Sequence, residues 1–181
     1  VADYVDKEIC DPSGQADPLS AAGSAIERQR DLMTLRKTFG QLDTSVLDFF
    51  FYEASGGSIV DDVFFYWEGF KSLTASSTYH IYDQALAQKI NDFRTAWQSS
   101  LSYGDWFVDL PGLDRYRFMT RYESPNPEAW REKYTAFQKS VIAAEEVFRD
   151  LIKYVKENYV ELDIDQTNIV ARNSYKHFAD G

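Results

Sequence analysis

The 181-residue sequence contains few of the residues that hold metals and disulfides: one cysteine, Cys10, and two histidines, His80 and His177. A single cysteine excludes an intrachain disulfide and a cysteine-rich zinc site. Di-iron sites in helical bundles use Glu-x-x-His motifs, but the residues three positions before the histidines are Ser77 and Ser174. We therefore expect no metal site and no cofactor.

The sequence also lacks the short motifs that accompany common catalytic and phosphate-binding sites. It has no Gly-x-Ser-x-Gly nucleophile motif, no phosphate-binding loop and no Gly-x-Gly-x-x-Gly fingerprint. The acidic stretch from Asp163 has the composition of a calcium loop, but Asn168 stands where such a loop requires glycine and Ser174 where it requires glutamate. We assign no catalytic residue, and these absences favour a non-enzymatic role.

Basic residues are too few for a nucleic-acid-binding surface: 19 Lys and Arg stand against 29 Asp and Glu, for a net charge of −10. Such a charge repels phosphate backbones and anionic membrane surfaces. It is compatible with a basic protein partner, and equally with solubility alone. We therefore expect no nucleic-acid partner.

Long apolar runs are missing as well, because no stretch approaches the roughly 18 consecutive apolar residues of a transmembrane helix. The single cysteine and the absence of an Asn-x-Ser/Thr sequon are typical of a reducing interior, so a cytoplasmic location is expected. The sequence begins with Val1 rather than Met. An alternative is therefore the soluble domain of a membrane-anchored protein, whose anchor or signal was removed before Val1.

Aromatic residues, by contrast, are abundant: 13 Phe, 12 Tyr and 4 Trp. With 44% hydrophobic residues, the chain can bury a core of its own. The first 17 residues differ, because five acidic residues there stand against one lysine, and proline and glycine interrupt any regular pattern. We expect residues 1–17 to form an acidic flexible arm and residues 18–181 to form a single helical domain.

The first part of this domain carries a heptad pattern. Apolar residues at alternating steps of three and four run from Leu32 to Phe49, which predicts one long helix over 18–54. Gly40 lies inside this helix and weakens it. The alternative is two helices, with Asp43 or Thr44 capping the second.

Four more helices are expected, over 59–73 with Ser58 as the cap, over 79–101, from about 128 to 158, and from about 166 to 178 with Asp163 or Asp165 as the cap. The helix over 128–158 has the most regular seam, formed by Trp130, Tyr134, Phe137, Val141, Ala144, Phe148, Leu151 and Val155.

These elements predict an all-α fold, an up-and-down antiparallel bundle of long heptad-patterned helices with one long aromatic loop over 102–127. The loop is long for a compact domain, and such loops are functional or disordered. Its dense aromatics argue against disorder. Alternation around Tyr116, Phe118, Thr120 and Tyr122 leaves open an α+β fold with a small sheet around 105–122.

Two clusters are candidates for binding. The first is His80, Tyr82 and Asp83, where a histidine beside an acid and a tyrosine has the chemistry of proton transfer; the alternative is the start of a helix with His80 at the surface. The second is an aromatic and charged set with the composition of protein interfaces; the alternative is a loop packed over the end of the bundle. Its members are Trp106, Phe107, Arg115, Tyr116 and Arg117.

From these patterns we predict a non-enzymatic helical protein-interaction or regulatory module, which binds a protein partner or associates with itself. One concrete form is a small acidic protein that neutralises a basic partner, as an antitoxin does. The alternative is a small-molecule sensor or enzyme whose pocket lies at the bundle end, lined by the aromatics of 103–122 and reached by His80.

Overall fold

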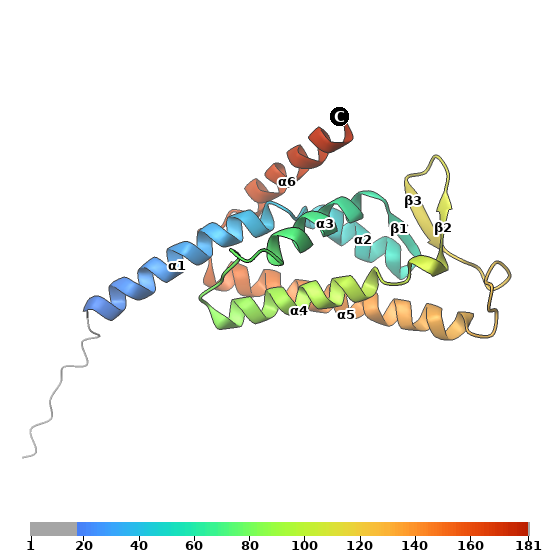
Figure 1. Ribbon diagram of the computed structural model, residues 1–181, viewed down its shortest axis with the longest axis horizontal. Coiled ribbons are helices and arrows are strands. Elements are labelled where there is room, and N and C mark those ends of the chain that lie inside the picture. Colours follow the sequence, from blue (N-terminus) through green and yellow to red (C-terminus); the bar gives the residue numbers. More distant parts are fainter. Residues whose placement is uncertain (1–17, 181) are drawn as a thin grey trace, which may run out of the picture.

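The computed structural model describes residues 18–180 (Figure 1), so the predicted acidic arm and Cys10 lie outside the described residues. The described chain is mostly helical, as predicted, and also carries a small three-stranded antiparallel sheet. In order, its elements are α1 (Pro18–Phe39), α2 (Thr44–Ser55), β1 (Ser58–Val60), α3 (Asp62–Thr74), α4 (Gln84–Ser100), β2 (Phe107–Leu110), β3 (Arg115–Phe118), α5 (Trp130–Asn158) and α6 (Ile164–Ala179).

The predicted single helix over 18–54 is wrong, because the chain turns between α1 and α2. The turn begins at Gly40, where a Cβ would lie 3.0 Å from the carbonyl oxygen of Arg36. Asp43 then adopts an extended conformation and caps α2 by accepting a hydrogen bond from the amide of Ser45. The two-helix alternative is therefore the observed arrangement.

This turn also shifts the phase of the buried face. The predicted seam holds as far as Leu42, but Phe49, its last member, is 45% exposed. Apolar residues at helical spacing stay on one face only as long as the helix is continuous. Because α2 is a separate helix, a different set of its residues faces the core. The residues of α2 that are buried are Leu47, Phe50, Phe51 and Ala54.

The predicted start of the next helix at Ile59 is also wrong. Ser58–Val60 forms β1, which pairs antiparallel with β3, and α3 begins only at Asp62. Gly57 permits this path because its φ of +85° is one that other residues rarely adopt. Strand β3 pairs on its other side with β2, so the sheet order is β1-β3-β2. The small sheet left open for residues 105–122 is thus present, enlarged by a strand from before α3.

Helices α4 and α5 lie side by side and antiparallel, and form the centre of the body (Figure 1). The predicted helix over 79–101 starts late, at Gln84, because Asp83 is its cap and accepts from the amides of Ala85 and Leu86. The seam of α5 is confirmed by six fully buried residues, and Asp163 caps α6, one of the two caps predicted. Those six residues are Phe137, Val141, Ala144, Phe148, Leu151 and Val155.

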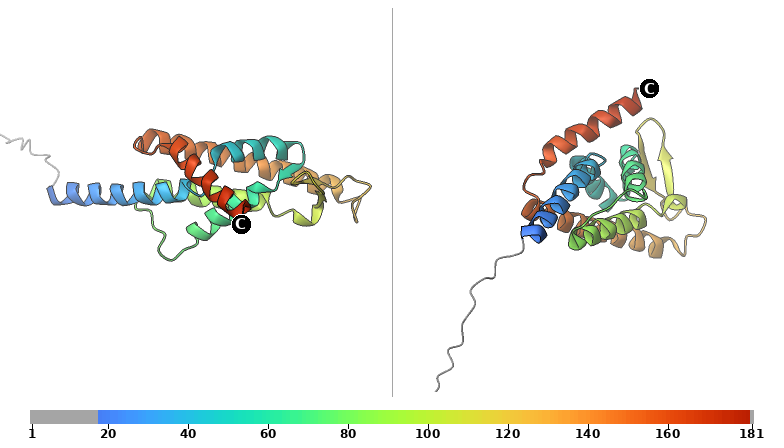
Figure 2. Two further views of the ribbon diagram at one scale, coloured as in Figure 1. Left: turned by 90° about the horizontal axis from the view of Figure 1, so that it is seen from above. Right: turned by 60° about the vertical axis from the view of Figure 1, so that its left-hand side comes forward.

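The first half of α1 extends from this body, and α6 runs in a different direction (Figures 1 and 2). Helix α6 buries few residues, namely Thr167, Asn168 and Ala171. Its attachment therefore depends on a few polar contacts and on the rings of Tyr175 and Phe178, both of which contact Phe65 of α3. In the described range 18–180, no helix is both long enough and apolar enough to cross a membrane.

Candidate functional site

A groove with a volume of about 750 Å³ runs between α2, α5 and the first turn of α6, and is larger than the other pockets described below. We call it the α2–α5–α6 groove. Its apolar lining comes from α5 and from the turn into α6, and consists of Phe148, Ile152, Leu162 and Ile164. These residues are buried or half-buried, so the groove offers an apolar floor to a ligand without exposing a large apolar patch.

The two walls of the groove carry opposite charge. The wall formed by α5 is basic on balance: it presents Arg149, Lys153 and Lys156, all exposed, together with one acidic residue, Glu157. Arg149 pairs with Glu145 at 2.6 Å and Lys153 approaches Glu157 at 4.0 Å, both along the same helix. Exposed pairs of this kind contribute little stability, so these side chains can exchange partners at low cost. The facing wall, from α2 and the first turn of α6, presents the acidic residues Asp48, Asp163 and Asp165.

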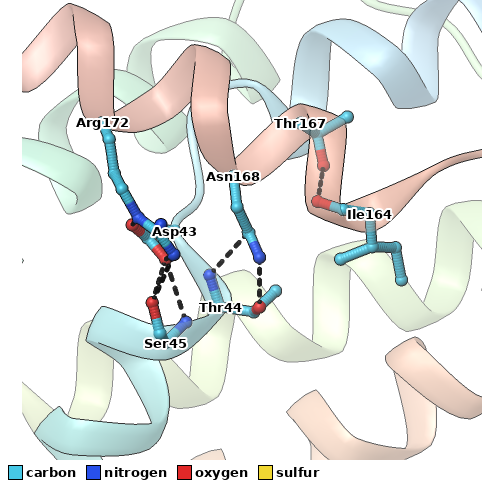
Figure 3. Close-up of polar contacts among 7 residues, drawn as sticks. All are labelled: Asp43, Thr44, Ser45, Ile164, Thr167, Asn168 and Arg172. Atoms are coloured by element: carbon cyan, nitrogen blue, oxygen red, sulfur yellow. Dashed lines mark hydrogen bonds and ion pairs between the residues drawn. The ribbon is translucent and has the colours of Figure 1, made fainter.

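A set of partly buried polar contacts holds α6 in the place where its first turn closes the groove (Figure 3). The amide of Thr44 donates to the side-chain oxygen of Asn168 at 2.9 Å, and the amide nitrogen of that side chain donates to the hydroxyl of Thr44, also at 2.9 Å. Arg172 of the next turn reaches Asp43 with its guanidinium. We call these four residues, two from the start of α2 and two from α6, the α6 clamp.

The carboxylate of Asp43 is the buried centre of the clamp, with its side chain 1% exposed. It accepts from Arg172 and from both the amide and the hydroxyl of Ser45, at 3.0 and 2.5 Å. Burial alone would raise the pKa of Asp43, but the hydrogen bonds from Arg172 and Ser45 outweigh it, so the pKa lies below its ordinary value. Asp43 is therefore ionised at neutral pH, and the clamp is charge-assisted.

A smaller pocket of about 310 Å³ lies on the other side of the clamp, between α2, α3 and α6. One of its residues, Asp62, has a buried Oδ1 that finds no hydrogen-bond donor among the described residues. Burial raises the pKa of Asp62, as it does that of the neighbouring Tyr66. Two carboxylates with opposite pKa shifts are the pattern of an acid–base pair. Asp43, however, already accepts hydrogen bonds from Arg172 and Ser45. We therefore assign it a structural role rather than a catalytic one.

The first predicted cluster lies elsewhere, where α1, α4 and α5 meet. Asp83 accepts from the hydroxyls of Tyr154 and Tyr159 at 2.8 and 3.1 Å. These bonds and those from its capped amides outweigh burial and place the pKa of Asp83 below its ordinary value. Asp31, which the sequence analysis did not single out, accepts from the backbone amides of Tyr82 and Asp83 at 2.7 and 2.8 Å. The acids of this cluster thus hold three helices together, while His80 is exposed.

The second predicted cluster packs mainly against the protein itself. Phe107 and Trp106 both contact the ring of Phe118, with centroids 5.2 and 6.1 Å apart. The three members from β3 are also engaged: Arg115 pairs with Glu53 at 2.8 Å, Tyr116 donates to Asp61 at 3.2 Å, and Arg117 pairs with Glu123 at 2.9 Å. Two of the five, Phe107 and Tyr116, line an apolar pocket of about 320 Å³.

The two predicted clusters are not brought together. His80, Tyr82 and Asp83 precede the first turn of α4, and the aromatic set follows its last turn, so the length of α4 separates them (Figure 1). At a rise of 1.5 Å per residue this is roughly 25 Å. A single pocket formed by the aromatics of 103–122 and reached by His80 is therefore not what the structure contains.

Among the described residues, no three His, Cys, Asp or Glu side chains are grouped as a metal site would require. Comparison of the chain with protein-family models, with curated proteins and with solved structures finds no match, so the site is interpreted from its own geometry.

Proposed function

We propose that this protein is a helical protein-interaction module that holds an amphipathic helix of a protein partner in the α2–α5–α6 groove. The observation that carries the proposal is the groove itself, with an apolar floor between two charged walls. Protein interfaces combine an apolar centre with a polar rim, and a helix laid into a groove is a recurrent form of recognition.

The charges of the walls define the partner segment. Its apolar stripe would lie over Ile152 and Ile164, on the floor of the groove. Acidic side chains along one flank would face Lys153 and Lys156 of α5, and basic side chains along the other flank would face Asp48. The net charge of −10 supports a partner that is basic overall, as in the neutralisation of a basic protein.

The proposal is tested by comparing what the tagged full-length chain captures with what two groove variants capture. Ile152→Asp places a carboxylate on the apolar floor, and Lys153→Glu reverses a charge at a position whose side chain is 71% exposed. The matched control is Tyr122→Ala, which removes an aromatic side chain that is 97% exposed and is not among the lining residues of the groove.

A protein captured by the parent and by Tyr122→Ala, and lost from both groove variants, supports the proposal. Thermal unfolding of each variant shows that the fold is retained. Equal capture by the parent and both groove variants refutes the assignment of the groove. If the captured protein is a second copy of the chain, the groove serves self-association, which sizing of the parent and the variants shows directly.

A further inference from the structure

Another pocket, of about 340 Å³, lies between the end of α3, the segment over 79–81 and one face of α4. Its lining contains no acidic residue, although the chain has 29 of them. Instead, its polar lining consists of the guanidinium of Arg94 and of side chains that can donate hydrogen bonds. These are Asn91, Gln84, Thr74, Tyr79 and His80.

Arg94 is unusual among the partly buried arginines of the described chain, because it forms no ion pair with any described residue. Arg115 and Arg117, which are also half-buried, pair with Glu53 and Glu123. The side chain of Arg94 makes one hydrogen bond, to the neutral side-chain oxygen of Asn91 at 3.1 Å. A guanidinium carries five N–H donors in a planar fork, so most of its donors remain open to a ligand.

The geometry points to a binding site for a small organic monocarboxylate in this pocket. The fork of Arg94 matches the two oxygens of a carboxylate, and arginine is the usual residue for such bidentate binding. The pocket supplies one guanidinium, which balances one negative charge rather than the two of a phosphate. Ala87, which is half-buried, and the small exposed parts of Ile81 and Ile90 line the pocket beside it and provide an apolar edge for a short aliphatic or aromatic group.

The volume is at the lower end of the range for ligand pockets, so the ligand is small. The pocket is separate from the α2–α5–α6 groove and shares no lining residue with it. This inference therefore does not depend on the proposed protein interaction, and either can fail without the other.

The test is a titration of the full ¹⁵N-labelled chain followed by amide chemical shifts. The probes are 3-methylbutanoate and benzoate, each beside its neutral amide, and inorganic phosphate. The parent is compared with Arg94→Gln, which keeps a helix-forming side chain and removes the charge. The control is Arg131→Gln, at an exposed position of α5.

We expect saturable shifts at Gln84, Asn91 and Arg94 with at least one of the two carboxylates, and none with the corresponding amide. Arg94→Gln should weaken that binding at least about tenfold, because a charge-assisted contact is lost, and Arg131→Gln should not change it. The inference is overturned if neither carboxylate causes saturable shifts, if the amides bind equally, if Arg94→Gln binds as the parent does, or if phosphate binds as tightly.

Discussion

Replacing Asp43 by alanine should loosen α6 without unfolding the body of the protein. The change removes the centre of the α6 clamp and the cap of α2 at once. Asp43→Asn is the informative companion, because asparagine caps a helix about as well as aspartate and lacks the charge that Arg172 requires. The pair of variants therefore separates the cap from the ion pair.

The expected loss in the free energy of unfolding is the sum of two contributions, one from the helix cap and one from the ion pair. Loss of an N-cap costs about 1 kcal/mol. A hydrogen bond to a charged group contributes about 1.5–3 kcal/mol when buried, but the side chain of Arg172 is 49% exposed, so solvent screening reduces this to about 1 kcal/mol. We expect Asp43→Ala to lower the free energy of unfolding by about 2 kcal/mol and Asp43→Asn by about 1 kcal/mol.

The assay is chemical denaturation together with amide hydrogen exchange read by mass spectrometry. In a chain of this size, a loss of 2 kcal/mol lowers the Tm by roughly 4–8 °C. Exchange should accelerate across α6, which buries few residues, and remain unchanged across α5, which buries six residues of its seam. Unchanged exchange in α6 of Asp43→Ala would refute the role of the clamp.

The carboxylate of Asp43 also makes the stability of the folded protein depend on pH. The pKa of Asp43 is lowered in the folded protein, so the unfolded chain binds more protons near the ordinary value of about 3.9. The stabilisation is therefore complete above about pH 5 and is lost as the pH falls below about 4. Asp43→Asn should lose less stability than the parent over this interval. Parallel acid-unfolding curves for the two proteins would contradict this.

Three further predictions concern single positions. Gly57→Ala should cost about 1–2 kcal/mol in denaturation, because alanine strains the φ of +85° and its Cβ would lie 3.2 Å from the ring of Tyr134. Phe107→Ala should lower stability by about 2–3 kcal/mol, since Phe107 packs on the core, whereas Tyr122→Ala should leave it within about 0.5 kcal/mol. Asp62→Asn should stabilise the protein at neutral pH by about 1 kcal/mol or less, because it removes a charge whose burial raises the pKa; the gain should vanish in acid.

Local sequence signals predicted the helices well where burial and capping act within one segment. The seam of α5 and the cap at Asp163 need no distant partner to be recognised. The start of α3 was mistaken because pairing of β1 with β3 joins residues nearly sixty positions apart, and such pairing leaves no periodic trace in a three-residue strand. The sequence offered the break at Gly40 only as an alternative to one continuous helix, because a single glycine is compatible with both a kinked helix and a turn between two helices.

The candidate site was harder to predict than the fold. Arg149, Ile152, Lys153 and Lys156 recur at helical spacing beside the seam of α5, which is a weak signal that any solvent-facing helix gives. Their facing wall comes from α2 and α6, so a groove exists only once the α6 clamp has placed α6. The aromatic loop was the stronger signal in the sequence, but four of its rings pack in or against the core: Tyr103, Trp106, Phe107 and Phe118.

The most direct test of the proposed function is hydrogen exchange of the full-length chain with its captured partner, compared with the chain alone. Binding in the α2–α5–α6 groove predicts slower exchange over residues 148–165 and at the start of α2, with the hairpin over 107–118 unchanged. Slower exchange confined to 103–122, with residues 148–165 unaffected, would contradict the groove and return the interface to the aromatic loop.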